Sequence, residues 1–308
     1  MRKLLKNLNK YTIALSALSA AALTNADILT SVRPLGFIAS SIADGITETQ
    51  VLIPAGASPH DYSMKPSDAK RVRDAEFVLW IGKDIDAFLE KSIAQRDATS
   101  VLTISKLAGI ESLLGETSAH DHDHDHDHDH HHSTNELEQD WHVWFSPKIS
   151  EQVAEQLAQQ LTQLYPQHQA KIATNLETFK QQLTTTNQQI TQQLAEFKDQ
   201  GFYVFHDAYR YFENAYGLQQ TGYFTINPLI APGAKKLAKI KEEINEHKVK
   251  CLFAEPQFTP KVLQTLQQST NVKIGQLDPM GEKIALGKGS YSAFLQQIAD
   301  NFAQCLQE

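Results

Sequence analysis

Cysteine is nearly absent from this chain: only Cys251 and Cys305 occur among its 308 residues. The two residues stand alone and far apart, which disfavours a pair of thiolate metal ligands without excluding one. In an oxidising compartment an even pair is most simply a disulfide. A disulfide that closes so long a loop would stabilise the fold by about 4 kcal/mol on the chain-entropy estimate.

Long apolar runs are also missing. The segment Thr12–Leu23 is too short and too weakly apolar to remain in a membrane. It follows a cationic start without acidic residues, MRKLLKNLNK, and precedes Ala26, a small residue of the kind that a signal peptidase requires. We therefore expect residues 1–26 to be a cleaved secretory signal peptide, with an uncleaved N-terminal anchor as the alternative. Because no cysteine lies near the expected cleavage site, we expect no lipid anchor.

Positive charge is in deficit. Once the four basic residues of the first 26 are removed, 24 Lys and Arg residues face 36 Asp and Glu residues. This balance argues against nucleic acid and anionic lipid as partners and is compatible with the attraction of cations. The remaining 282 residues suffice for one large domain or two medium ones.

Apolar residues are wholly missing from one internal tract, HDHDHDHDHDHHH at 120–132. Such a tract cannot bury anything, so we expect a flexible, disordered loop over about 116–139. An engineered tag and a merely solvated charge run are the alternatives, but tags lie at termini and imidazole is the commonest protein ligand for zinc. We expect a low-affinity metal loop that collects zinc or senses its abundance. Its eight histidines are His120, His122, His124, His126, His128, His130, His131 and His132.

Short apolar runs alternate with helical patterns in the first and the last part of the chain. Parallel strands need a crossover connection, so this alternation predicts parallel sheets covered by helices. The runs that we expect to be buried strands are Ile28–Val32, Thr49–Ile53, Phe77–Ile81, Val101–Ile104, Phe202–Phe205, Cys251–Ala254 and Val272–Leu277.

The middle of the chain predicts a long helix. It begins at Pro166, ends near Gly201 and would be roughly 50 Å long at 1.5 Å per residue. One apolar stripe follows it, and a helix that joins two lobes explains this stripe better than a dimeric coiled coil, because few charges are present to set a register. The stripe consists of Ile172, Leu176, Phe179, Leu183, Ile190, Leu194 and Phe197.

The predicted fold class is α/β, with two (β/α) lobes of parallel sheets, one long rigid helix between them and a metal site in the cleft. We place the N-terminal lobe at 27–165, the linking helix at 166–200 and the C-terminal lobe at 201–308. In open parallel sheets, ligands bind outside the carboxyl ends of the strands. Histidines at strand ends and in adjoining loops are therefore the candidates for ligands.

Five histidines lie outside the tract. His60 stands in GASPHDY, His142 in WHVWFSP and His206 at the start of HDAY, all at strand ends or in loops that can face one cleft. His168 and His247 lie in polar helical stretches, where we expect them to be solvated. Taken singly, His60, His142 or His206 would be interpreted as a structural histidine. Together, in a chain that also has the histidine tract, the three predict a shared metal site.

The motifs VLIPAGASPHDYSMKPSD, WHVWFSP, FYVFHDAYRYFE and CLFAEPQF…LDPMG, in this order, resemble the ZnuA family. These are the periplasmic zinc-binding components of bacterial ABC importers, within the metal-binding solute-binding proteins. The resemblance covers essentially the whole mature chain, the histidine tract and the cysteine pair. It implies two lobes bridged by a rigid helix, with the ion held between them and delivered to a membrane permease.

Carried over by position, the resemblance implies the ligands His60, His142 and His206 and a disulfide between Cys251 and Cys305. Three imidazoles suit Zn²⁺, whereas manganese prefers carboxylate oxygens. Manganese-binding relatives have a carboxylate where this chain has His206.

The fourth ligand is less defined. Some ZnuA sequences have Glu before the first histidine, but this chain has Pro59, so we expect Asp278 or a water molecule there. We expect Asp61, Asp207 and Glu255 to orient the imidazoles by accepting their other N–H groups. A helix cap or a surface salt bridge is the alternative role for each of the three.

The predicted function is to capture Zn²⁺ in the periplasm and deliver it to the permease, which has a cytoplasmic ATPase. We expect a monomer that is not an enzyme and binds no nucleic acid. Binding of manganese or another divalent metal is the first alternative. A periplasmic zinc hydrolase is less favoured because no HExxH motif is present. A surface adhesin is also less favoured, because an adhesin needs surface tethering and we expect no lipid anchor.

Overall fold

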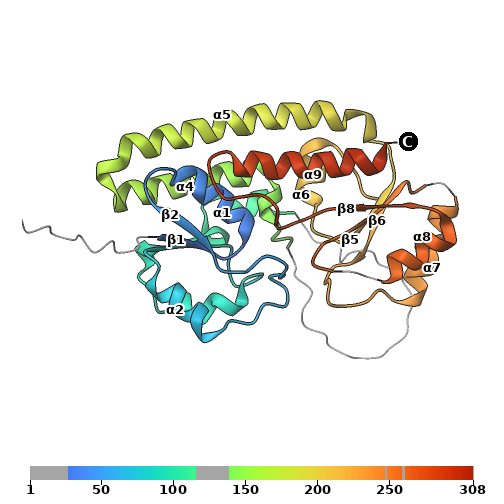
Figure 1. The fold of residues 1–308 in the computed structure, drawn as a ribbon, viewed down its shortest axis with the longest axis horizontal. Helices are drawn as coiled ribbons and strands as arrows, with labels where there is room; N and C mark the ends of the chain where they lie inside the picture. The colour runs from blue at the N-terminus through green and yellow to red at the C-terminus, as the bar shows by residue number, and fades with distance from the viewer. Residues whose placement is uncertain (1–26, 116–138, 247, 259–260, 308) are drawn as a thin grey trace, which may run out of the picture.

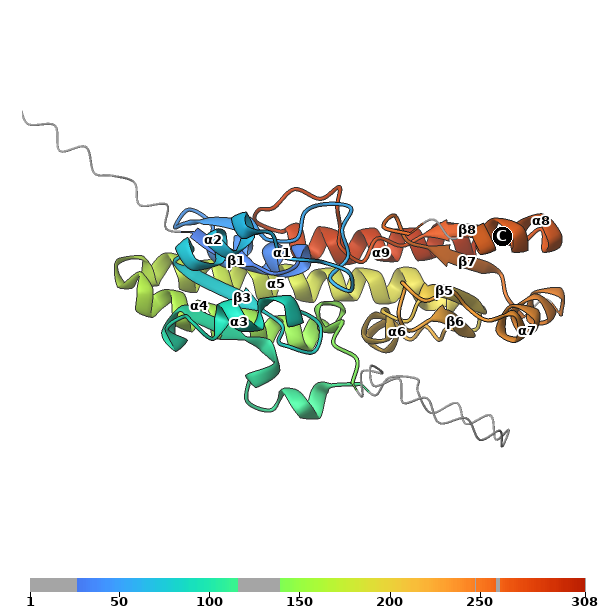
Figure 2. The same ribbon diagram turned by 90° about the horizontal axis from the view of Figure 1, so that it is seen from below.

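The computed structural model describes residues 27–115, 139–246, 248–258 and 261–307. The predicted signal peptide and the histidine tract lie outside the described residues. Two α/β lobes lie side by side beneath a pair of long helices, as Figures 1 and 2 show from two directions. The predicted fold class is confirmed.

The N-terminal lobe is built on a four-stranded parallel sheet of order β2-β1-β3-β4. Its strands follow the predicted runs closely, and the central strands β1 and β3 are the most buried. The strands are β1 (Asp27–Thr30), β2 (Glu48–Val51), β3 (Phe77–Trp80) and β4 (Val101–Thr103), and the helices of this lobe are α1 (Arg33–Ile42), α2 (Pro66–Asp74) and α3 (Glu90–Ile93).

The C-terminal lobe repeats this topology in the order β6-β5-β7-β8. Strand β6 was not predicted, since it begins with a glycine and only two of its four residues are buried, which leaves no apolar run. The strands are β5 (Phe202–His206), β6 (Gly222–Thr225), β7 (Cys251–Ala254) and β8 (Lys273–Gln276), and the helices of this lobe are α6 (Arg210–Tyr216), α7 (Ala234–Asn245) and α8 (Lys261–Thr270).

The predicted linking helix is α5 (Gln169–Leu194), which lies across both lobes (Figure 1). Short 3-10 turns extend it at both ends, and six of the seven residues of the predicted stripe are buried. The stripe packs against α4 (Pro147–Leu164) and α9 (Ser290–Leu306). The 3-10 turns among the described residues are Ala87–Leu89, Ala98–Ser100, Ile104–Lys106, Ile110–Leu113, Val143–Phe145, Pro166–His168 and Ala195–Phe197.

Helix α9 also contacts both lobes, because it packs against α1 on one side and β8 on the other. We placed this segment in the C-terminal lobe; the structure shows that it runs beside α5 as a second brace (Figure 1). One continuous core joins the lobes beneath these helices, with Phe37, Phe145, Phe294 and Phe302 fully buried in it. The lobes are therefore held together by a shared apolar core.

The outer face of each sheet has its own smaller core. Side chains alternate along β1, so that Ile28 enters the shared core and Leu29 the outer core of the N-terminal lobe. The outer core of the C-terminal lobe lies under α7 and α8 around Ile240 and Leu263. Both sheets are thus covered on both faces, which is what parallel sheets require.

The predicted disulfide between Cys251 and Cys305 is present, with the two Cα atoms 6.0 Å apart. It joins the first residue of β7 to the last turn of α9, and both half-cystines are buried. Among the described residues, no helix combines the length and the apolar character that a membrane span would need.

Candidate metal centre

The three strand-end histidines come from both lobes. His60 lies in the loop after β2, where its backbone N–H donates to Ser58 Oγ at 3.3 Å. His142 precedes the 3-10 turn Val143–Phe145, which leads into α4. His206 is the last residue of β5, at the carboxyl end of the second sheet, where ligand sites of open parallel sheets are expected.

Local structure explains how His142 is held in place. Ser146 caps α4 by accepting a hydrogen bond from Ile149 N at 3.2 Å, and Pro147 occupies the first helical position. Trp144 in the preceding turn is fully buried, and Tyr291 of α9 donates its hydroxyl to the Trp144 carbonyl at 2.9 Å. The turn that carries His142 is therefore anchored in the shared core.

The three imidazoles converge on one point. One ring nitrogen from each lies within 4.8 Å of those of the other two, and this is the one group of potential metal ligands found among the described residues. The Nε2 atoms of His60 and His142 are 3.2 Å apart. Two nitrogens on a tetrahedral zinc ion with Zn–N bonds of 2.0–2.1 Å would be about 3.3 Å apart. The spacing suits two ligands of a single zinc ion.

Asp140 fixes the tautomer of His142. Its Oδ1 accepts from the His142 Nδ1–H at 2.7 Å and from the His142 backbone N–H at 2.9 Å. Because a carboxylate can only accept, the proton lies on Nδ1 and the lone pair of Nε2 faces the other two histidines. We did not predict Asp140, although its place two residues before a candidate ligand was a usable signal.

His206 presents an unpaired nitrogen to the same point. Its Nε2 is buried and has no hydrogen-bond partner among the described residues. Its Nδ1 lies 3.5 Å from Glu255 Oε1, and the backbone of Ile226 also hydrogen-bonds this imidazole. A buried polar atom without a partner is rare in folded proteins, and a metal ion would satisfy it. Glu255, predicted as an orienting residue, thus lies beside His206.

Burial keeps the imidazoles of His60 and His206 neutral. Burial and, to a smaller extent, the neighbouring His142 lower the pKa of His206 to about 3. Burial, with the other two histidines, also lowers the pKa of His60 well below its usual value. Burial raises the pKa of Glu255 to about 8. The cavity therefore disfavours charge of its own and offers neutral nitrogen ligands to an incoming cation.

The space between the histidines is small. The cavity has a volume of about 10 Å³, which is room for one ion or one water molecule. Trp144 closes one side by donating its Nε1–H to the Pro279 carbonyl at 3.1 Å. Besides the three histidines, the cavity is lined by Ser58, Pro59, Trp144, Glu255, Gln257, Phe258, Pro279 and Met280.

Three further predicted site residues lie outside the histidine group. Asp61 is exposed, and Asp207 accepts from Arg210 Nε at 3.0 Å and from Gln220 Nε2 at 2.7 Å. Asp278 is buried but is not part of the histidine group. Its Oδ1 accepts from Met280 N at 3.0 Å and its Oδ2 from Glu282 N at 2.7 Å. The contacts of Asp278 are those of a turn-forming residue.

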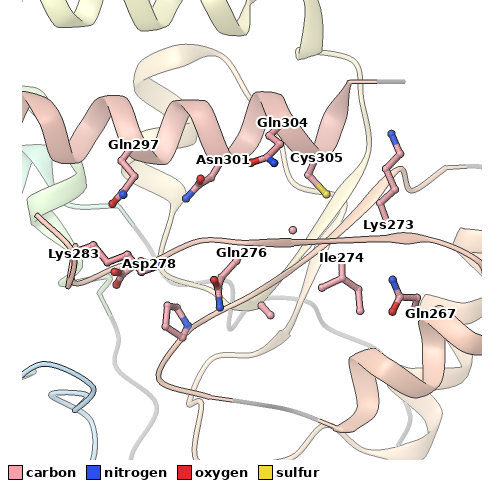
Figure 3. Close-up of a pocket in the computed structure, with 13 residues that line it drawn as sticks. Gln267, Lys273, Ile274, Gln276, Asp278, Lys283, Gln297, Asn301, Gln304 and Cys305 are labelled. Atoms are coloured by element: carbon pink, nitrogen blue, oxygen red, sulfur yellow. The ribbon is translucent and has the colours of Figure 1, made fainter.

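Figure 3 places Asp278 at the end of β8, beside a polar pocket between β8 and α9. None of the three histidines lines this larger pocket. His168 is half-buried just before α5 and belongs to no ligand group, while His247 lies outside the described residues. Within the described residues, the metal-binding geometry thus lies in the small cavity between the lobes.

Replacing Asp140 tests the orientation of His142. We expect Asp140→Ala to weaken zinc binding by about 10- to 100-fold, as loss of an outer partner of a metal-bound histidine does. Chelator competition on the purified protein measures this change. The control is Asp97→Ala, which removes an exposed aspartate that accepts a hydrogen bond from Thr99 N at 2.8 Å. Equal zinc affinities for the two variants would contradict the assignment.

Comparisons with known proteins agree on one family. A family model named ZnuA and described as "Zinc-uptake complex component A periplasmic" matches residues 28–305. The high-affinity zinc uptake system protein ZnuA of Haemophilus influenzae is 53% identical over 338 residues, covering 99% of each chain. The protein of the same description from Yersinia pestis is 43% identical over 294 residues, covering 92% of each. The fold is similar to a crystal structure of ZnuA with a TM-score of 0.75 and 23% identity, over 91% of this chain and 99% of that one.

Proposed function

The chain belongs to the ZnuA family of zinc-uptake proteins, and from this premise we propose that His60, His142 and His206 hold Zn²⁺ between its two lobes. The observation that carries the assignment is the convergence of three buried or half-buried imidazoles, with the Nε2 of His206 left without a partner. Neutral imidazoles favour zinc over manganese, which prefers oxygen ligands.

A water molecule suits the fourth coordination position better than Asp278. Both carboxylate oxygens of Asp278 already accept hydrogen bonds from backbone N–H groups. Pro59, which precedes the first histidine, has no ligand atom in its side chain. His60 is only half-buried, so a water molecule can reach an ion bound by the three rings. We therefore retain water as the fourth ligand and Asp278 as the alternative.

The role is binding and delivery. Three histidines with an open position also describe catalytic zinc, but a cavity of about 10 Å³ has no room for an organic substrate beside the ion. The partner of a periplasmic component of this family is the membrane permease of an ABC importer, with its cytoplasmic ATPase. The mature chain would start at Asp27, remain free of lipid and act as a monomer, with lobes at 27–165 and 201–308 joined by 166–200.

The histidine tract at 120–132 would act as a weak collector or sensor of zinc. Eight histidines offer several ligand sets, and ordering such a polar segment around an ion costs conformational entropy, which keeps each affinity low. Because the tract precedes His142 closely in the sequence, zinc bound to it would raise the local zinc concentration near the cleft. This role follows from composition alone.

Deleting residues 120–132 separates the two kinds of site and tests the function. We expect the deleted protein to keep one tightly bound zinc per chain after mild chelation and to lose the weakly bound equivalents. Native mass spectrometry with equimolar zinc and manganese measures both stoichiometry and selectivity. Loss of the tight equivalent, or preferential retention of manganese, would refute the proposed function, and retention of every weak equivalent would refute the role of the tract.

Acid should remove the weak equivalents first. Solvated imidazoles protonate near pH 6.5 and then cannot bind a metal. The pKa values of His60 and His206 lie below that value, so their lone pairs remain available at lower pH. In a titration from pH 7.5 to 5.5, we expect the tight zinc to persist after the tract zinc has been released. Simultaneous release of both classes would contradict this order.

A further inference from the structure

Three segments from both lobes form the rim of the metal cavity. The loop that carries His60 contributes Ser58 and Pro59 from the N-terminal lobe, and the segment after β7 contributes Glu255 and Gln257. The turn after β8 contributes Pro279 and Met280. The space left between them is about 10 Å³, so small changes in the spacing of these segments would alter how easily an ion passes.

A single carboxylate joins the three segments. Glu282 Oε1 accepts from the backbone N–H of Gly56, in the His60 loop, at 2.7 Å. The same oxygen accepts from Gln257 Nε2 at 2.7 Å, and Gln257 lines the cavity. Glu282 itself belongs to the turn after β8, where its N–H donates to Asp278 Oδ2 at 2.7 Å. The bond to Gly56 spans 226 positions in sequence and crosses from one lobe to the other.

Neighbouring bonds keep this carboxylate in place. Asp278 accepts from Met280 N and Glu282 N and so shapes the turn. It also accepts from Gln257 Nε2 at 3.1 Å, which orients the side-chain amide that donates to Glu282. Arg33 of α1 donates to the Gly281 carbonyl at 3.2 Å and also to the Ile284 carbonyl at 2.5 Å, which ties the turn to the N-terminal lobe on both sides of Glu282. The turn is thus fixed by several hydrogen bonds. Gly56 is exposed, and among the described residues one hydrogen bond joins it across the rim.

We propose that Glu282 is a positioning residue that latches the His60 loop to the C-terminal lobe and thereby sets the rate of zinc entry and release. This inference rests on the zinc site proposed above. Hydrogen bonds to a charged acceptor are stronger than neutral ones, so the latch opposes separation of the rim. Glu282 contacts none of the three histidines through a described hydrogen bond, so it acts on exchange through the loop.

Replacing Glu282 should accelerate exchange more than it weakens binding. We expect Glu282→Ala to release zinc roughly tenfold faster, a factor that corresponds to about 1.4 kcal/mol. Zinc capture should accelerate by a similar factor, since the ion enters and leaves past the same rim. Glu282→Gln keeps an oxygen acceptor without the charge. Its release rate should therefore lie between those of the wild type and Glu282→Ala. Stopped-flow mixing with a chromogenic chelator, and with free zinc, measures the two rates on the mature protein.

Controls separate a latch from a general loss of stability. Glu196→Ala removes an exposed glutamate in the 3-10 turn after α5 and should leave both rates unchanged. Gln257→Ala should accelerate release by itself but add little to Glu282→Ala, because the two side chains share one network. The proposal would be overturned if both Glu282 variants released zinc at the wild-type rate, or if the effects of Glu282→Ala and Gln257→Ala were additive. It would also be overturned if the affinity fell by the same factor as the release rate rose. Failure of the wild type to bind zinc would instead overturn the proposed function.

Discussion

Replacing His206 with alanine is expected to abolish tight zinc binding. The substitution removes the proposed ligand from the C-terminal lobe, and with it the buried nitrogen that has no hydrogen-bond partner among the described residues. We expect the affinity to fall by more than about 100-fold, beyond the 10- to 100-fold effect of changing an outer partner. Isothermal titration of protein without the tract measures the loss without interference from weak sites. His60→Ala should behave in the same way.

The matched control for His206→Ala is His168→Ala. His168 is half-buried and belongs to no ligand group in the described structure, so its removal should leave one tight zinc equivalent. Circular dichroism should show that both variants remain folded, since the shared core does not include either imidazole. Tight binding in His206→Ala, or its loss in His168→Ala, would show that the ion is held elsewhere.

Removing the disulfide should produce the largest loss of stability. The Cys251–Cys305 bond closes a loop of 54 residues, and the chain-entropy estimate gives about 4 kcal/mol for its stabilisation. For a protein of this size, we expect the double alanine variant to melt roughly 10 °C lower. Alanine is preferred to serine because both positions are buried and a serine hydroxyl would need a partner. Differential scanning calorimetry of the apoprotein measures the shift.

Zinc binding provides the control for this variant. The disulfide fastens α9 to β7 and contributes no ligand, so the double variant should still bind one zinc ion at temperatures where it is folded. Addition of a dithiol reductant to the wild type should reproduce the lower melting temperature. An unchanged melting temperature would mean that the shared core alone holds α9 in place.

Several features of the site could be predicted from residue patterns. His60, His142 and His206 were recognisable because each lies at a strand end or in a loop, and the fold class places such positions at one edge of a parallel sheet. Strand β7 was predicted with its observed bounds, Cys251–Ala254, because its residues are uniformly apolar. Strand β6 was missed because its pairing with β5, and not its composition, makes it a strand.

Roles that depend on a partner were harder to predict. Asp278 follows a strand as a ligand should, but its oxygens accept from Met280 N and Glu282 N, two and four residues further on, as those of a turn-forming aspartate do. Asp140 was missed although it is only two residues from His142. Glu282 could not be found at all, because its partner Gly56 lies in the other lobe.

The sequence by itself determined the two α/β lobes, the long helix, the cysteine pair and three candidate nitrogen ligands. These features depend on periodicity, on turn residues and on side-chain chemistry, which are properties of each segment alone. Only the tertiary structure decided that the imidazoles meet within 4.8 Å, that α9 braces both lobes, that Asp140 hydrogen-bonds His142 and that Glu282 hydrogen-bonds Gly56. The reason is physical: a hydrogen bond between residues hundreds of positions apart exists only after the shared core has brought the two lobes together.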